Sequence, residues 1–234
     1  MTTMGSLIAA CATFVGSHFL LSHPLRDPMV RRMGEAAFRG IYSLVALLSF
    51  AWVVLAYRAA PAIAPSYVPG PIGWGVATAL MLVASVLLAG SFFGNPALPS
   101  PHANAAATRN ALGTMAVTRH PMMWSFAIWS LVHILIWPTW ENHVLATSIL
   151  LLSLGGAFGQ DMKKARLMGD SWRGWVRRTS FVPFTGQLSG RISWGAAWPG
   201  WGTMVLGIGI WLLATWLHGP LGGRMPAGIW YWLS

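Results

Sequence analysis

Residues 72–93 read IGWGVATALMLVASVLLAGSFF and contain no charged side chain. A helix needs about 20 mostly apolar residues to cross the hydrocarbon core of a bilayer, so this stretch is long enough to span it. Five other stretches have the same character, and the six expected spans are residues 5–22, 41–60, 72–93, 121–138, 144–160 and 201–218. We therefore expect an all-α, polytopic membrane helix bundle that forms a single transmembrane domain over residues 1–234.

The composition supports a membrane protein and argues against a nucleic-acid-binding one. Of the 234 residues, 55% are hydrophobic and 9% are charged, whereas soluble domains carry about 25% charged residues. The net charge of +10 is high, but no soluble region is large enough to present a basic face. Membrane lipid is therefore the expected partner of these charges, and nucleic acid is not.

The positive charges alternate between the two ends of the expected spans. All fifteen Lys and Arg residues except Arg58 and Arg224 follow the first, third or fifth span. Because basic loops stay in the cytoplasm, this pattern orients the chain with both termini in the periplasm of a bacterial inner membrane. No Lys or Arg precedes Arg26, so a cleaved signal peptide is not expected.

The segment after the fifth span mixes basic and aromatic side chains, which is typical of an interfacial amphipathic helix. Four tryptophans there suit the headgroup level of a membrane: Trp172, Trp175, Trp194 and Trp198. The final residues, AGIWYWLS at 227–234, are too short to span and are expected at the periplasmic interface.

Ionisable residues inside spans are costly and are therefore functional candidates. His18 lies in the first span and His133 in the fourth, while His23 and His120 lie at the cytoplasmic ends of these spans. Histidines on two helices of a bundle can ligate a metal or haem. Alternatively, each histidine forms a hydrogen bond with a neighbouring helix, and His23 with His120 is a rival ligand pair. Asp161 lies at the cytoplasmic edge of the fifth span, so paired-carboxylate chemistry has little support.

Three arginines lie at the cytoplasmic rim, Arg26, Arg39 and Arg119. They either anchor lipid headgroups or form a pocket for an anionic ligand. The sequence contains no phosphate-binding loop, dinucleotide motif or Ser–His–Asp signature.

Four motifs in order resemble the NnrU family: HFLLSHPLR at 18–26, GEAAFRGIYSLVAL at 34–47, TRHPMMWSFAIWSLVHI at 118–134 and DMKKARLMGDSWRGWVRRTSFVPF at 161–184. The resemblance covers about residues 5–185 and leaves residues 186–234 as a C-terminal helix and an interfacial segment. The family is linked to nitrite and nitric oxide metabolism. It includes a haem b membrane enzyme that isomerises the central cis double bond of 15-cis-ζ-carotene.

The resemblance implies haem b as cofactor and redox-dependent cis–trans isomerisation of an apolar polyene as activity. By motif position, the catalytic haem ligands fall on His18 and His133, with His23, His120, Arg26, Arg39 and Arg119 as further cofactor-binding candidates. The enzyme carries a cysteine three residues before the second histidine, where this chain has Ser130. Because a hydroxyl is a poor iron ligand, a cysteine-for-histidine ligand switch is not implied here.

Two alternatives stay open. The first is a non-catalytic accessory factor in nitrite or nitric oxide metabolism, with a partner in a membrane complex. The second is an S-adenosylmethionine-dependent methyltransferase, from a more distant resemblance of Arg119-His120-Pro121 and its surroundings to the isoprenylcysteine methyltransferase-type membrane fold. That fold uses an acidic pair where this chain has Asp161-Met162, so one acid is missing.

Overall fold

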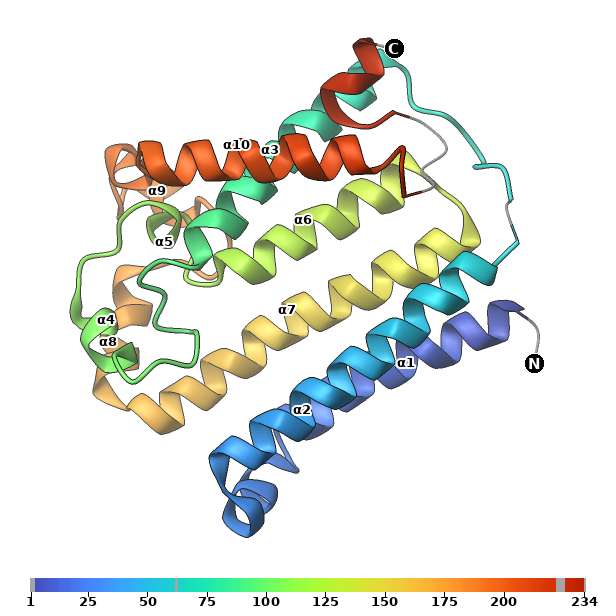
Figure 1. Ribbon diagram of the computed structural model, residues 1–234. Coiled ribbons are helices and arrows are strands. Elements are labelled where there is room, and N and C mark those ends of the chain that lie inside the picture. The colour runs from blue at the N-terminus through green and yellow to red at the C-terminus, as the bar shows by residue number, and fades with distance from the viewer. Residues whose placement is uncertain (1–2, 62, 222–225, 234) are drawn as a thin grey trace. The chain divides into compact units, whose positions relative to one another are not determined.

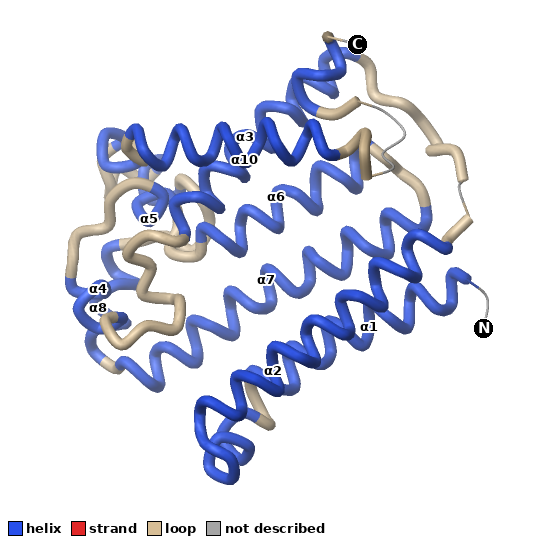
Figure 2. Tube along the Cα trace, in the orientation of Figure 1, coloured by secondary structure: helices blue, strands red, loops and turns tan. Residues whose placement is uncertain are grey.

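The computed structural model describes residues 3–61, 63–221 and 226–233, and within these residues it consists of helices joined by loops, with no β-strand (Figures 1 and 2). This confirms the all-α prediction. The elements are α1 (Thr3–Ser22), α2 (Arg26–Ala59), α3 (Pro71–Ser91), α4 (Ala103–Thr108), α5 (Thr114–Val117), α6 (Pro121–Ile136), α7 (Trp140–Met168), α8 (Asp170–Arg178), α9 (Thr185–Leu188), η1 (Trp194–Ala197), α10 (Trp201–Leu217) and η2 (Gly228–Trp232).

Helices form at all six expected spans. Four of them, α1, α2, α3 and α7, are long and apolar enough to cross a membrane. Helices α6 and α10 are apolar but have 16 and 17 residues, which makes them about 24 and 26 Å long. The hydrocarbon core is about 30 Å thick. The number of spans and the side on which the termini lie therefore remain predictions.

Helix α2 begins 15 residues before the expected span at 41–60, because a short additional helix is joined to the span across a bend. Gly34 interrupts the helix with φ 80° and ψ 163°, a conformation that costs glycine little and other residues much more. The bend separates a short, charged first segment from the long apolar helix. Arg26 on the first segment donates to the Glu35 carboxylate at 2.9 and 3.1 Å, which ties the two segments together.

The chain divides into two compact units, Met1–Val68 with His133–Gly159, and Pro69–Val132 with Gln160–Ser234. We call them unit 1 and unit 2 and describe each by itself. Helices α6 and α7 each continue from one unit into the other. This division therefore does not decide whether the chain is a single transmembrane domain, and that expectation stays a prediction.

In unit 1, helix α1 packs against α2 and runs parallel to α7 (Figure 1). The first half of α1 lies against Val144 and Leu145 near the start of α7. Further along, a Cβ on Gly155 would lie 2.7 Å from the Phe19 ring, and one on Gly159 would overlap the His23 imidazole. Gly155 and Gly159 therefore form a small-xxx-small contact, which lets two membrane helices approach closely.

In unit 2, helices α3 and α10 cross at Gly207, where an added Cβ would lie 2.8 Å from the Val86 Cα. The short helix η2 packs on both, and Tyr231 stacks on Trp74 with ring centroids 5.0 Å apart. The segment predicted as an interfacial piece at 227–234 thus packs against two helices through its described residues.

Helix α8 is the predicted helix after the fifth span, but its two tryptophans are buried. Trp172 and Trp175 are 1% and 2% exposed and pack with Met115 and with alanines of unit 2. These two side chains therefore do not form an exposed interfacial face, because one face of α8 packs on α4, and the prediction that they lie at headgroup level stays a prediction. Trp194 and Trp198 are exposed, and their depth in a membrane stays a prediction.

Candidate functional site

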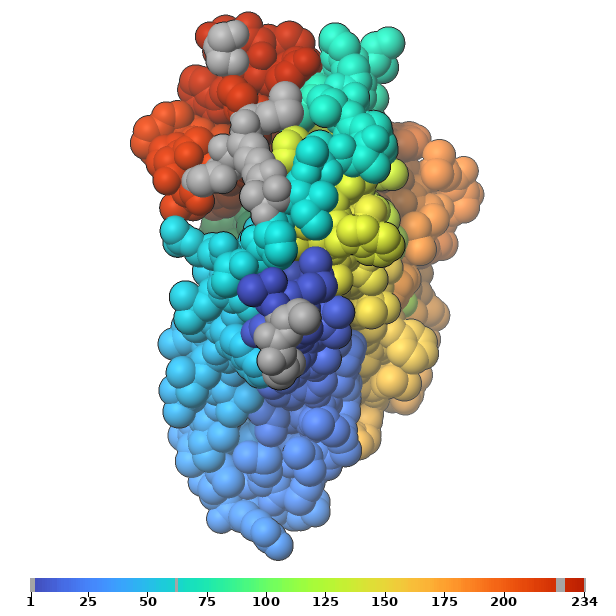
Figure 3. Space-filling view, turned by 90° about the vertical axis from the view of Figure 1, so that its right-hand side faces the viewer, coloured from blue at the N-terminus to red at the C-terminus, as the bar shows by residue number. Residues whose placement is uncertain are grey.

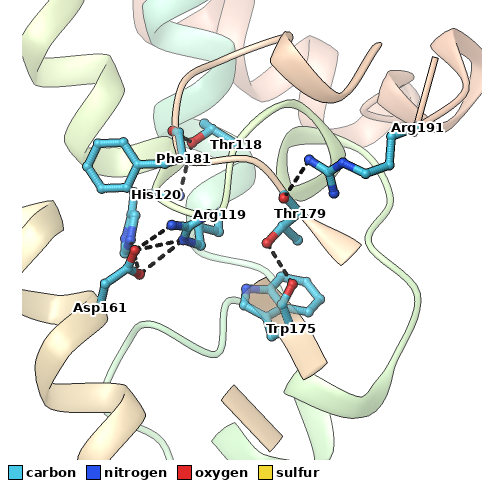
Figure 4. Close-up of polar contacts among 8 residues, drawn as sticks. All are labelled: Thr118, Arg119, His120, Asp161, Trp175, Thr179, Phe181 and Arg191. Atoms are coloured by element: carbon cyan, nitrogen blue, oxygen red, sulfur yellow. Dashed lines mark hydrogen bonds and ion pairs between the residues drawn. The ribbon is translucent and has the colours of Figure 1, made fainter. Parts of the chain in front are cut away.

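A buried polar cluster lies where α6 begins. Arg119 and His120 directly precede Pro121, the first residue of α6, and both side chains reach Asp161 on α7 (Figure 4). The Arg119 Nε and Nη2 atoms donate to the carboxylate at 2.5 to 3.0 Å. The His120 Nε2 atom donates to Asp161 Oδ1 at 2.7 Å. One carboxylate therefore holds two buried side chains, with His120 0% and Arg119 11% exposed.

The segment after α8 completes this cluster. The Phe181 ring lies 5.2 Å from the Arg119 guanidinium carbon and 5.5 Å from the His120 ring centroid. Thr118 Oγ1 donates to the Phe181 carbonyl at 2.6 Å, and the Arg119 N–H donates to the Ser180 carbonyl at 2.8 Å. These bonds hold Phe181 beside the Arg119 guanidinium and the His120 ring (Figure 4).

Two further side chains hold the segment after α8 through its first residues, Thr179 and Ser180. Arg191 donates to the Thr179 carbonyl at 2.9 Å and to Ser180 Oγ at 3.0 Å. Thr179 Oγ1 donates to the Trp175 carbonyl at 2.7 Å, which anchors the segment to the end of α8 (Figure 4). The polar cluster is therefore preorganised by backbone contacts on both sides.

One of the two ring nitrogens of His120 is not used in the contact with Asp161. Because the Asp161 carboxylate accepts from Nε2–H, Nδ1 carries a lone pair whenever the ring is neutral. Nδ1 is buried and has no hydrogen-bond partner among the described residues. Such an orphaned acceptor costs about 1–3 kcal/mol. Chemically, this nitrogen can accept a proton or a hydrogen bond. It is a poor haem ligand, because Nδ1 adjoins the side-chain attachment point and a porphyrin would crowd it.

Asp161 follows the expected span 144–160. Helix α7 has 29 residues and is about 43 Å long, so its end extends beyond a hydrocarbon core of about 30 Å. Burial raises the pKa of the Asp161 carboxyl, but hydrogen bonds and positive charge from His120 and Arg119 outweigh it, and the pKa is lowered. The carboxyl is therefore ionised at neutral pH.

His18, in unit 1, is arranged as a metal ligand would be. Its Nδ1 atom donates to the Phe14 carbonyl at 2.7 Å, so the lone pair lies on Nε2. The ring packs edge-on against Phe14 and Tyr42, with centroids 4.4 and 5.5 Å away. The Nε2 atom is the ring nitrogen that suits haem iron, so His18 fits as a single haem ligand.

His133 and His18 lie beside different parts of α7, far apart along its axis. Both residues lie in unit 1, and the His133 carbonyl accepts from the Asn142 side chain at 2.7 Å. Phe19, next to His18, contacts Gly155, which is 13 residues further along α7 than Asn142. At 1.5 Å per residue this separation is about 20 Å. Both imidazoles cannot bind one iron at this register, so the residues do not fit a haem held by this pair.

The other predicted residues have separate environments. His23 packs on Gly159 in unit 1, whereas His120 belongs to unit 2, so their pairing stays a prediction. Arg26 binds Glu35 and lies over the Phe38 ring, and Arg39 is exposed. Ser130, three residues before His133, is fully buried and donates to the Phe126 carbonyl within its own helix. The described residues contain no cluster of three or more His, Cys, Asp or Glu side chains that could bind a metal.

Sequence reasoning missed Asp161 as the centre of the cluster. The available signal was an acid at the predicted cytoplasmic end of one span and an Arg-His pair at the same predicted end of the preceding one. Pairing them requires the helix register, which the sequence does not provide.

The fold and the site define an all-helical membrane protein with a buried Arg–His–Asp cluster at the start of α6. The chain belongs to the NnrU family, described as NnrU protein, whose family model matches residues 6–226. This match extends past residue 185, so much of the C-terminal part is also family sequence.

One curated relative is similar over a shorter stretch. The 15-cis-zeta-carotene isomerase, chloroplastic, of Arabidopsis thaliana is 32% identical over 83 residues, which cover 34% of this chain and 22% of that protein. The similar region therefore spans about a fifth of the relative's length. No solved structure matches the chain.

Proposed function

We propose that this protein is a membrane isomerase that converts a cis double bond of an apolar polyene, such as 15-cis-ζ-carotene, to trans. The observation that carries the proposal is the 32% identity to 15-cis-zeta-carotene isomerase, within a chain that belongs to the NnrU family.

The surface of unit 1 supports a substrate that arrives from the lipid. Helix α2 exposes Leu44, Leu47, Leu48 and Leu55, each more than half exposed, and its surface is uncovered in one side view (Figure 3). Side chains of this kind contact acyl chains in a membrane. A polyene dissolved in the hydrocarbon core would meet the protein laterally, without passing through water.

The proposed cofactor is haem b, with His18 as its ligand through Nε2. Bound haem would supply a redox-active iron that interacts with the polyene and lowers the order of its double bond. The chain's own contribution at this point is orientation, because the Phe14 carbonyl fixes the His18 tautomer and the Phe14 and Tyr42 rings fix the plane of the imidazole.

The Arg119–His120–Asp161 cluster contributes rigidity to the proposed enzyme. It fastens the start of α6 to the end of α7 within unit 2 through charge-assisted hydrogen bonds. Loss of the cluster would weaken the contact between the start of α6 and α7.

The test uses bacterial cells that accumulate 15-cis-ζ-carotene in darkness, because light isomerises polyenes. Expression of the wild-type chain should reduce the 15-cis isomer on chromatography, whereas a membrane-inserted His18→Ala chain should not. Unchanged isomer content with well-expressed wild-type protein would reject the isomerase and favour the accessory role in nitrite or nitric oxide metabolism.

A further inference from the structure

A pocket of about 470 Å³ lies in unit 2, after the end of α3 and beside α4. Phe92, Leu98, Pro99 and several alanines form its apolar wall, whereas His102 and Arg109 contribute basic groups. Its volume falls in the range of small-molecule sites, about 300–1,000 Å³. The pocket is thus large enough for a charged group together with part of an apolar or glycerol-like moiety.

The basic groups of the pocket have no acidic partner. The chain contains five acidic residues, and none of them lines the pocket. Asp27 and Glu35 pair with Arg26, Asp161 with Arg119 and His120, and Asp170 with Arg173, while Glu141 is buried elsewhere. The Arg109 and His102 side chains form no hydrogen bond or ion pair with the described part of the chain, and both residues are exposed. Both side chains can therefore donate hydrogen bonds to an external anion, and the Arg109 guanidinium is positively charged.

A buried ammonium group lies behind the wall. Lys164 is 8% exposed, and its Nζ donates to the carbonyls of Pro96 at 2.8 Å and Leu98 at 3.2 Å. No carboxylate of the described residues pairs with this ammonium group. A buried, uncompensated charge acts through a low dielectric, so it strengthens the positive potential in the pocket.

The walls are held in place without a ligand. Lys164 fixes the loop that carries Leu98, and Arg178 donates to the Ala107 carbonyl of α4 at 2.5 Å. Asn95 Oδ1 accepts from the Ala97 N–H at 2.9 Å, which stabilises the turn after α3. A preformed site loses less conformational entropy when a ligand binds.

We propose that this pocket binds a phosphate group, with Arg109 and His102 as its direct contacts. A guanidinium can donate two parallel hydrogen bonds to phosphate oxygens, and the apolar wall suits the portion attached to the phosphate. The phosphate belongs either to an anionic lipid headgroup or to a soluble phosphate. This site goes beyond the proposed isomerase and does not depend on it.

The experiment measures ligand binding to the full-length protein in mild detergent by native mass spectrometry. The probes are dioleoylphosphatidylglycerol, zwitterionic dioleoylphosphatidylcholine and inorganic phosphate. The variants are Arg109→Gln and His102→Gln, and the control is Arg173→Gln, which removes an exposed arginine that already pairs with Asp170.

The proposal predicts that Arg109→Gln weakens binding of the preferred probe at least about tenfold and His102→Gln severalfold, whereas Arg173→Gln changes it less than twofold. Preference for phosphatidylglycerol, with no effect of inorganic phosphate, identifies a headgroup site. Competition by inorganic phosphate identifies a soluble ligand. Equal binding of both lipids with no phosphate binding would overturn the proposal, and so would full binding by Arg109→Gln.

Discussion

His120 and Asp161 are 41 residues apart in the sequence, yet His120 Nε2 lies 2.7 Å from the Asp161 carboxylate in the buried cluster of unit 2. Arg119 binds the same carboxylate, so a single acid compensates two basic side chains. Removal of this acid leaves both basic side chains without their partner, and for this reason Asp161 is the most informative target for stability measurements.

Asp161→Asn should strongly destabilise the protein. It leaves the buried Arg119 guanidinium without a counterion, which typically costs about 3–5 kcal/mol. The control is Asp170→Asn, which breaks an Asp–Arg pair whose side chains are 95% and 58% exposed, and exposed pairs contribute little. Unfolding in mixed detergent measures both. Equal midpoints for the two variants would show that the buried cluster does not stabilise the fold.

The same carboxyl should make stability depend on acid pH. Because the pKa of Asp161 is lowered in the folded protein, its contribution is fully present above the ordinary carboxyl pKa of about 4. It is lost as the pH falls below that value through the lower folded pKa. Wild-type stability should therefore decrease more steeply below about pH 4 than that of Asp161→Asn. Parallel pH profiles from thermal unfolding would contradict this assignment.

Gly155→Ala should weaken the packing of α1 on α7. The added methyl would lie 2.7 Å from the Phe19 ring, and overpacking of this kind costs about 1–3 kcal/mol. Gly16→Ala is the matched control, since nothing lies within 4 Å of its added Cβ. An Ala in place of Gly there should leave stability unchanged or raise it by about 0.4–1 kcal/mol. Thermal unfolding in one detergent compares them, and a neutral Gly155→Ala would place the close contact in doubt.

The absorption spectrum separates the two predicted haem ligands. If His18 holds haem b, His18→Ala should lose or shift the Soret band and the reduced α band. His133→Ala should keep both bands, because the helix register places His133 about 20 Å away along α7. Oxidised and dithionite-reduced spectra of the purified proteins measure this. A His133→Ala spectrum that changes as much as that of His18→Ala would show that both histidines reach the iron.

The six apolar helices could be predicted because each expected span is a long apolar run with at most one Lys, Arg, Asp or Glu. Residues 72–93, for example, fall almost entirely within α3. Other features depend on contacts that have no local signature. Nothing in the sequence around Gly34 predicts a bend, and only its positive φ in the structure shows the bend in α2. Trp172 looks interfacial from its arginine neighbours, but packing of α8 on α4 buries it.

The candidate site was predicted only in part, because some of its features have a local sequence pattern and others depend on contacts between helices. The residue types at its centre, Arg119 and His120, were evident from the Arg-His-Pro motif. Their common partner was not, because charge-assisted pairing follows from how α6 and α7 are aligned. Likewise, the sequence places His18 and His133 both inside spans, and only the neighbours Phe19, Gly155 and Asn142 reveal their different levels.

The most direct test of the isomerase is conversion by the purified protein. The wild-type chain in lipid nanodiscs is incubated in darkness with 15-cis-ζ-carotene, with and without dithionite, and the isomers are separated by chromatography. The Arabidopsis relative serves as the positive control. The 15-cis isomer should disappear under reducing conditions with the wild-type chain and persist with His18→Ala. Persistence of the 15-cis isomer with folded, haem-reconstituted wild-type protein, while the positive control converts it, would contradict the proposed function.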